Sequence, residues 1–121
     1  MTTTISLFKQ TNPLENRKEE SSRIRTKYSN KVPLICEKMH SSKIKLQTGY
    51  KEKYLCPCDF TLAQFMHVLR QKINFSPEKA LFLFINGQIK SNTRTLGDLY
   101  EEDCDKDGFL YVFFDEENVF G

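Results

Sequence analysis

The 121-residue sequence lacks a long apolar run and a secretory signal. Because no stretch of about 18 apolar residues occurs, we predict that no segment spans a membrane. The N-terminus, MTTTISLFKQ, has no basic segment followed by an apolar stretch, so it does not have the form of a signal peptide. These absences predict a cytoplasmic protein whose four cysteines are reduced thiols.

The sequence also lacks the common signatures of catalytic and metal sites. It has no glycine-rich phosphate loop and no nucleophile elbow. A cysteine–histidine nucleophile would have to combine His67 with Cys58 or Cys104, and no third residue that would orient the histidine is indicated. Structural zinc needs paired ligands, usually two pairs, whereas Cys56-Pro57-Cys58 is a single, closely spaced pair. We therefore predict neither an enzyme, nor a metal protein, nor a cofactor.

The acidic stretch from Asp103 to Gly108 resembles the start of a calcium-binding loop. The complete loop needs a bidentate glutamate at its twelfth position. Counted from Asp103, that position is Phe114, which lies in a predicted strand. We therefore predict a solvated acidic turn at this place.

Charge is divided unevenly along the chain, although the net charge is only +2. Residues 1–55 have a net charge of +7 and residues 56–121 a net charge of −5. The basic half could contact acidic peptides or anionic lipid, or the two halves could simply attract each other. The basic segment from Arg17 to Lys27 lacks interleaved aromatic residues that would stack on bases, apart from Tyr28 at its end, so we predict no nucleic-acid partner.

The N-terminal region predicts a helix after a loose tail of residues 1–8. Asn12 is a suitable N-cap, Pro13 suits the first helical position, and Glu15 stands where a capping-box carboxylate would. The helix is expected to reach about Tyr28. Its apolar face is thin, so we expect it to dock on the domain without belonging to the core.

The rest of the chain alternates between strand and helix patterns. Pro33 places the first strand at a sheet edge, or else lies near the start of that strand. Five apolar residues between Leu62 and Ile73 fall at helical spacing, and Asn86-Gly87 is a tight hairpin signal. In chain order we predict strands over 31–38 and 53–58 joined as a hairpin, a helix over 61–73, a short helical turn over 76–78, a strand over 80–85 with a hairpin partner, a helical turn over 95–100 and a strand over 109–114.

This β-β-α-β-β-α-β order predicts an α+β fold, specifically the ubiquitin-like β-grasp, in which a mixed sheet folds around one main helix. We expect three parts: an N-terminal helical extension (1–29), the β-grasp domain (30–114) and a flexible C-terminal tail (115–121). The last strand is expected at the centre of the sheet. A tail leaving that strand would be free for another protein to grip, and its final glycine has no side chain to obstruct a narrow channel.

The second strand has features of a peptide-binding edge. An exposed strand edge can accept another chain by strand addition, through backbone hydrogen bonds. Lys51 and Lys53 could then face an acidic flank of the added peptide, and Leu55 could line an apolar pocket. The same pattern also fits an ordinary strand.

Several motifs resemble one known family. Ile24-Arg-Thr-Lys-Tyr-Ser-Asn-Lys-Val-Pro33 resembles its segment IRxKYPxxVP, and Lys53-Tyr-Leu-Cys-Pro57 resembles its KYLVP. Asp107-Gly-Phe-Leu-Tyr111 and the end Val119-Phe-Gly121 also match. On these motifs, the chain over about residues 8–121 resembles the autophagy-related protein 8 family of ubiquitin-like modifiers, which includes the GABA-A-receptor-associated proteins and microtubule-associated light chain 3.

The resemblance implies a β-grasp core preceded by two helices and a covalent function for Gly121. Its carboxylate would be adenylated, passed through thioesters and joined to the amino group of phosphatidylethanolamine. The implied partners are activating and conjugating enzymes, a deconjugating cysteine protease, cargo receptors and the lipid itself. The protein would be cytoplasmic, and autophagosomal when lipidated, acting in autophagosome formation and cargo recruitment.

The resemblance also implies a docking site for motifs of the form aromatic-x-x-aliphatic. Lys51 and Lys53 would meet acidic flanking residues, with Lys31 and Arg70 as further basic contacts. The aromatic pocket would use Glu20, Ile24, Pro33, Lys53, Leu55 and Phe109, and the aliphatic pocket Tyr54, Cys56, Pro57, Phe60, Phe65 and Val68.

Some positions depart from the family pattern. Most members carry residues after the glycine that a cysteine protease removes, whereas Gly121 is the last residue here, as either the native end or a trimmed form. Cys56 replaces a valine and Ser29 replaces a proline, and loop 39–52 is about two residues longer than in the shorter relatives. The alternative function is a non-conjugated β-grasp adapter that binds peptides or the cytoskeleton.

Overall fold

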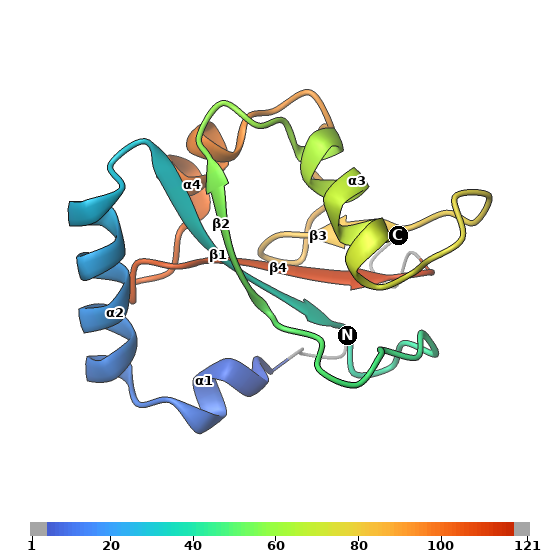
Figure 1. Ribbon diagram of the computed structural model, residues 1–121, viewed down its shortest axis with the longest axis horizontal. Helices are drawn as coiled ribbons and strands as arrows, with labels where there is room; N and C mark the ends of the chain where they lie inside the picture. Colours follow the sequence, from blue (N-terminus) through green and yellow to red (C-terminus); the bar gives the residue numbers. More distant parts are fainter. Residues whose placement is uncertain (1–4, 118–121) are drawn as a thin grey trace.

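The computed structural model describes residues 5–117, which form a mixed four-stranded sheet with helices on both faces (Figure 1). In the sheet order β2-β1-β4-β3, β1 pairs antiparallel with β2 and parallel with β4, and β3 pairs antiparallel with β4. The predicted α+β class and the central last strand are thus confirmed. In chain order the elements are α1 (Leu7–Thr11), α2 (Leu14–Lys27), β1 (Lys31–Lys38), β2 (Lys53–Pro57), α3 (Leu62–Lys72), β3 (Phe82–Phe84), α4 (Leu96–Asp103) and β4 (Leu110–Asp115).

Both faces of the sheet are buried. Side chains alternate between the faces of a strand, so β1 sends Leu34 and Cys36 into the main core with α3 and α4, and Ile35 into a second cluster with Phe8 and Phe109. Figure 1 shows α1 and α2 on one side of the sheet and α3 and α4 on the other. Coverage on both sides explains why β1 reads as a continuous apolar run.

The predicted main helix is confirmed as α3, which is one residue shorter at each end than predicted and has Thr61 as its N-cap. The Thr61 hydroxyl accepts a hydrogen bond from the Gln64 backbone N–H, and the Gln64 side chain accepts one from the Thr61 backbone N–H at 2.8 Å. This reciprocal capping box satisfies two N–H groups that the helix itself leaves unpaired. Leu62, Phe65 and Leu69 lie at helical spacing and are buried in the main core.

The N-terminal region is more ordered than predicted. Residues 7 and 8 were expected in a loose tail, but they begin α1, which Ser6 caps by accepting from the Lys9 backbone N–H. Asn12 was predicted to be the N-cap of the next helix, which is wrong. It lies at the C-terminal end of α1, where its amide donates to the Phe8 carbonyl. Pro13 is the N-cap of α2 and offers no side-chain hydrogen bond. The two helices that the family resemblance implied are both present.

A buried ion pair fastens α2 to the turn before β4. Arg17 Nε donates to Asp107 Oδ2 at 2.8 Å, and the Tyr111 hydroxyl donates to the same oxygen. The prediction that this acidic turn is solvated is wrong for Asp107, because its side chain is fully buried. Gly108 has φ +89°, and a Cβ there would lie 2.3 Å from Ser21 Oγ, so α2 approaches this turn too closely for any other residue.

The structure corrects the predicted elements between α3 and β4. Residues 76–78 form a hydrogen-bonded turn and no helix, and the strand predicted over 80–85 is reduced to the three residues of β3. The Asn86-Gly87 turn is confirmed, with φ values of 52° and 73° and two backbone hydrogen bonds between Ile85 and Gln88. The segment after this turn is not a strand. Within the described residues, its pairing with the segment before the turn is limited to the isolated bridge between Ile85 and Gln88. The helical turn predicted over 95–100 is longer and ends at Asp103.

The boundaries of the predicted strands and tail also shift slightly. β1 lies between β2 and β4, so Pro33 does not mark a sheet edge; it lies near the start of the strand, as the second interpretation held. β4 includes Asp115, which is buried, so the tail begins one residue later than predicted.

Among the described residues, no helix combines the length and the apolar character needed to cross a membrane.

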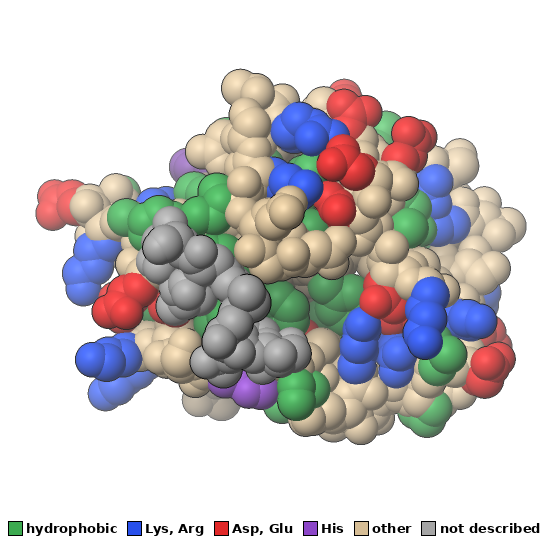
Figure 2. Space-filling view, turned by 180° about the vertical axis from the view of Figure 1, so that it is seen from behind, with side chains coloured by type: hydrophobic (Ala, Val, Ile, Leu, Met, Phe, Trp, Pro, Cys, Tyr) green, Lys and Arg blue, Asp and Glu red, His purple; other side chains and the backbone are tan. Residues whose placement is uncertain are grey.

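Basic and acidic side chains are mixed on the surface. Figure 2 shows them next to one another on the face turned away in Figure 1, rather than in two separate fields. Within residues 5–117, two ion pairs join the basic and acidic halves of the chain: Lys9 with Asp105 at 2.6 Å, and Arg17 with Asp107. The uneven charge along the sequence therefore serves, at least in part, to hold the N-terminal extension on the domain.

Candidate functional site

The edge strand β2 presents two different faces. It pairs with β1 on one side and is the outermost strand of the sheet. Lys53 and Leu55 lie on the exposed face, and Leu55 is one of the few large apolar side chains with substantial exposure, at 38%. Tyr54 and Cys56 point the other way, toward α3 and the main core. This alternation follows from the two-residue period of a strand.

The exposed face of β2 is bridged to α2. Lys53 Nζ lies 2.8 Å from Glu20 Oε2 and 5.3 Å from the centroid of the Phe8 ring. Ile24 and Phe109 belong to the apolar cluster on this same side of the sheet. Because the Glu20–Lys53 pair is solvent-exposed, it adds about 1 kcal/mol of stability at most and is easily opened by a competing ligand.

The α3 side of β2 is an aromatic wall. The Tyr54 and Phe65 rings meet edge to face, with centroids 5.1 Å apart and planes at 83°. The Tyr54 hydroxyl donates to the Tyr50 hydroxyl at 3.3 Å, which in turn donates to the Cys36 carbonyl. Phe65 is fully buried, so it supports this wall from beneath.

Burial keeps the Tyr54 hydroxyl and the Cys56 thiol uncharged. Burial raises the pKa of the Cys56 thiol to about 11, although nearby Lys31 acts in the opposite direction. Burial likewise raises the pKa of Tyr54 to about 12. A neutral, buried thiol behaves as a small apolar side chain. Cys56 can therefore stand in for the valine of the family pattern without adding a charge.

A groove of about 510 Å³ runs along the outer edge of β2. Its floor and walls include Tyr54 and Leu55, and its basic residues are Lys51, Lys53 and Lys72. The structure thus brings together four residues that the sequence singled out for peptide binding. Apolar contacts between lysines suit an extended peptide with an apolar anchor and acidic neighbours.

Sequence reasoning missed part of this groove. Lys72 lies in the last turn of α3, two residues beyond Arg70, and only the fold brings it to β2. Residues 47–50 complete the wall from the loop that precedes β2. Their polar composition carried no signal for a site, because it is equally typical of a plain connecting loop.

The remaining predicted contacts are spread around β2. Arg70 donates to the Ser76 carbonyl at 2.9 Å and lies over the Phe75 ring, so it is engaged in the turn after α3. Lys31 faces the Tyr28 ring at the end of the β1–β2 hairpin away from Lys53. Of the other predicted pocket residues, Pro57 and Phe60 are half-buried between β2 and α3, and Val68 is half-buried on α3 itself. Pro33 is buried in β1.

The side chains considered for catalysis or metal binding do not assemble. His67 is exposed on α3, and its ring nitrogen lies 3.4 Å from the Gln71 amide. Cys36, Cys56, Cys58 and Cys104 are free cysteines. Within residues 5–117, no group of three or more histidine, cysteine, aspartate or glutamate side chains is placed to hold a metal ion.

The central strand β4 delivers the C-terminal tail. It lies between β1 and β3, and the Phe114 carbonyl accepts from the Met39 backbone N–H at 2.9 Å. The start of the tail is therefore fixed beside the end of β1. Gly121, the predicted conjugation residue, lies outside the described residues.

Comparisons with known proteins agree over nearly the whole chain. The family profile described as "Autophagy protein Atg8 ubiquitin like" matches residues 16–121. The chain is 47% identical over 116 residues to autophagy-related protein 8 of Colletotrichum lindemuthianum, covering 96% of this chain and 94% of the relative. It is 46% identical over 116 residues to the Emericella nidulans protein of the same name, covering 96% of this chain and 97% of the relative.

Solved structures of the same kind resemble the fold. The crystal structure of Trypanosoma brucei ATG8 superposes with a TM-score of 0.85 at 32% identity, covering 92% of this chain and 94% of that chain. Plasmodium falciparum Atg8, solved in complex with a Plasmodium falciparum Atg3 peptide, gives a TM-score of 0.83 at 30% identity, covering 93% of this chain and 98% of that chain.

Proposed function

The chain belongs to the Atg8 family of ubiquitin-like autophagy proteins, and we propose that it is a modifier joined through Gly121 to phosphatidylethanolamine. The observation that carries this proposal is the match of residues 16–121, which includes the terminal glycine, to the family. The position of β4 supports it, because this central strand fixes the start of the segment that leads to Gly121.

The chemistry would be carried out by other proteins on the Gly121 carboxylate. Adenylation by ATP releases pyrophosphate and makes the carboxyl group reactive. An enzyme thiolate then displaces AMP to form a thioester, and the lipid amine displaces the thiolate to leave an amide. This chain supplies the acyl group and the surface that the enzymes bind; we propose that it is not itself an enzyme and needs no cofactor. A glycine end leaves the carboxyl carbon open to attack.

The conjugate would sit on the autophagosomal membrane, with the unconjugated form in the cytoplasm. The two acyl chains of the lipid give stable anchoring, which a single chain does not. The folded domain would remain at the membrane surface and recruit partners there. A deconjugating cysteine protease would hydrolyse the amide and release the protein.

We propose that the β2 groove is where partners dock. Lys51, Lys53 and Lys72 surround exposed Leu55, which suits an aromatic-x-x-aliphatic motif with acidic flanks. Cargo receptors with such motifs are the expected ligands. The Plasmodium relative bound to an Atg3 peptide supports a conjugating enzyme as a further partner of this chain.

Reconstituted conjugation tests the covalent function. With activating and conjugating enzymes of a fungal relative, ATP and vesicles containing phosphatidylethanolamine, the chain should form a lipid adduct. Gly121→Ala should lose most of this product, because a Cβ beside the carboxyl carbon hinders each transfer. Asn118→Ala is the matched control and should conjugate normally. Equal conjugation of both variants would contradict the assignment of Gly121.

The alternative is an adapter that binds peptides or the cytoskeleton without being conjugated. The observation in its favour is that the β2 groove is formed entirely by the folded domain. An adapter would form no thioester with the activating enzyme and would keep its cellular location when Gly121 is replaced by alanine. The same reconstitution therefore separates the two functions.

A further inference from the structure

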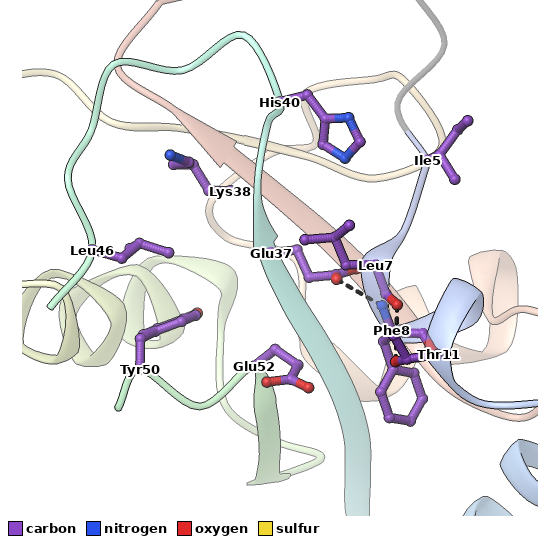
Figure 3. A pocket seen from close by; sticks show the side chains of 10 residues that line it. All are labelled: Ile5, Leu7, Phe8, Thr11, Glu37, Lys38, His40, Leu46, Tyr50 and Glu52. Carbon is purple, nitrogen blue, oxygen red and sulfur yellow. Dashed lines mark hydrogen bonds between the residues drawn. The ribbon is translucent and has the colours of Figure 1, made fainter. Parts of the chain in front are cut away.

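A second hollow lies between α1, the end of β1 and the loop before β2, and it shares Tyr50 with the β2 groove (Figure 3). Its volume is about 560 Å³. Figure 3 shows Leu46 and Tyr50 entering from the loop on one side of β1, and Ile5 and Leu7 from the N-terminal segment on the other. We call this hollow the α1 pocket. Apart from Tyr50, its lining residues do not belong to the β2 groove.

The α1 pocket has an apolar rim that nothing in the described residues covers. Ile5 and Leu7 are 51% and 57% exposed. They are two of the four large apolar side chains exposed in residues 5–117, and the others, Leu55 and Ile89, lie elsewhere. Exposed apolar side chains that gather around one hollow suit a docking surface better than the same side chains scattered singly.

The wall formed by α1 is held in place before anything binds. Buried Glu37 accepts a hydrogen bond from Ser6 Oγ at 2.5 Å and another from the Phe8 backbone N–H at 3.0 Å. The Phe8 ring packs edge to face on Phe109 at 5.5 Å. The α1 pocket is therefore preformed, so an occupant need not order this wall.

The C-terminal tail starts beside the rim of the α1 pocket. β4 runs parallel to β1, with Phe114 opposite Lys38, and its carbonyl accepts from Met39. Lys38 and the next residue after Met39, His40, both line the pocket. Residues 116–121 follow, and six residues span up to roughly 20 Å when extended. Crossing β1 requires less than this, because neighbouring strands lie about 4.8 Å apart.

The chemistry of the tail fits the α1 pocket. Its sequence, Glu116-Glu-Asn-Val-Phe-Gly121, places its two apolar residues at 119 and 120, near the end. An aromatic ring suits a hollow lined by Leu46, Tyr50 and exposed Leu7. His40 and Lys38 lie on the rim as donors for the Gly121 carboxylate, and the Lys38 ammonium also donates to the Ile44 carbonyl at 3.1 Å.

We propose that the α1 pocket binds the chain's own tail, with the Phe120 side chain inserted between α1 and the loop before β2. The bound tail keeps its terminal carboxylate against the domain. Taken with the proposed function, on which this consequence rests, conjugating enzymes must first withdraw Phe120 from the pocket. The pocket is thus a resting site for the reactive end.

Tryptophan fluorescence of the purified protein tests this docking without enzymes or lipid. The chain contains no tryptophan, so Phe120→Trp introduces a single probe. We expect blue-shifted emission and a several-fold lower acrylamide quenching constant than in the matched control Glu117→Trp. Equal, solvent-like emission and quenching of the two probes would overturn the proposal. A blue shift that grows with protein concentration would also overturn it, since the occupant would then be a second copy.

A second substitution identifies the pocket. Adding Leu7→Glu to Phe120→Trp should return the emission and quenching to solvent-like values. The change should not unfold α1, because Leu7 is exposed and an acidic residue in the first turn of a helix is favourable. Ile89→Glu, at an exposed apolar residue outside the pocket, should leave the probe protected. A probe that stays protected in the Leu7 variant would overturn the assignment to this pocket.

Because the indole of a tryptophan is larger than a phenylalanine ring and could fit the pocket poorly, a second measurement tests the natural Phe120. Phe120→Ala should shift the methyl NMR signals of Ile5 and Leu7, because a ring above them is lost. Unchanged methyl signals would contradict docking. These results are independent of conjugation: the tail can dock in a protein that is never lipidated, and a failure to dock leaves the reconstitution with Gly121→Ala as informative as before.

Discussion

Asp107→Ala should lower the free energy of unfolding by about 3–5 kcal/mol, the cost typical of leaving a buried charge without its partner. Arg17 lies 2.8 Å from this carboxylate and is only 9% exposed, so its guanidinium would remain in the interior uncompensated. The substitution also removes the acceptor of the Tyr111 hydroxyl and of the Phe109 backbone N–H. Urea denaturation followed by circular dichroism measures the change.

The loss should be concentrated where α2 meets the domain. Amide hydrogen exchange should accelerate more in α2 than in the central strands, because this buried ion pair fastens α2 to the domain. Glu19→Ala is the control: it removes an exposed pair with Arg23 at 3.8 Å and should change stability by about 0.5 kcal/mol or less. A loss below about 1 kcal/mol for Asp107→Ala would mean that the pair is not a major support of the fold.

Replacing both Lys53 and Leu55 with alanine should weaken binding of an acidic aromatic-x-x-aliphatic peptide by about thirty-fold or more. The reason is that a central apolar anchor of an interface is typically worth about 2 kcal/mol, which is roughly thirty-fold in affinity. Leu55 is the exposed apolar residue of the β2 groove, and Lys53 supplies the adjacent positive charge. Isothermal titration calorimetry at two salt concentrations measures the effect.

The single variants separate the two contributions. Lys53→Ala should reduce the salt dependence of binding, because it removes a charge at the rim, whereas Leu55→Ala should weaken binding equally at both salt concentrations. Ile89→Ala is the control, at an exposed apolar residue outside the groove, and should leave affinity unchanged. If the double variant also binds normally, the peptide docks elsewhere.

Most of the fold could be predicted from the sequence because the patterns that specify its main elements lie within short stretches of the chain. The apolar spacing that predicted α3 lies within a dozen residues, and the Thr61–Gln64 capping box that the prediction did not use is equally local. The family resemblance implied α1, but the local pattern did not locate it, because five residues give too little periodicity. Its stability comes from Glu37 and from burial of Phe8 by residues far along the chain. The second hairpin strand was overpredicted, since the Asn86-Gly87 turn specifies only a reversal of direction.

Only part of the site could be predicted from the sequence, because a local pattern does not show which distant residues the fold brings together. Alternation along β2 indicates which of its side chains share a face, so Lys53 and Leu55 could be grouped from the sequence. Lys72 joins them through the packing of α3 beside β2, which no local pattern records. Conversely, Arg70 carries the charge that a site residue would need, but its position in the fold commits it to the Ser76 carbonyl.

Mass spectrometry of the C-terminal peptide from membrane and soluble fractions of the source cell tests the central proposal most directly. The account predicts a phosphatidylethanolamine adduct on Gly121 in the membrane fraction, increasing under starvation, and a free carboxylate in the soluble fraction. A free carboxylate in both fractions, in starved as well as growing cells, would contradict the modifier function and favour the non-conjugated adapter.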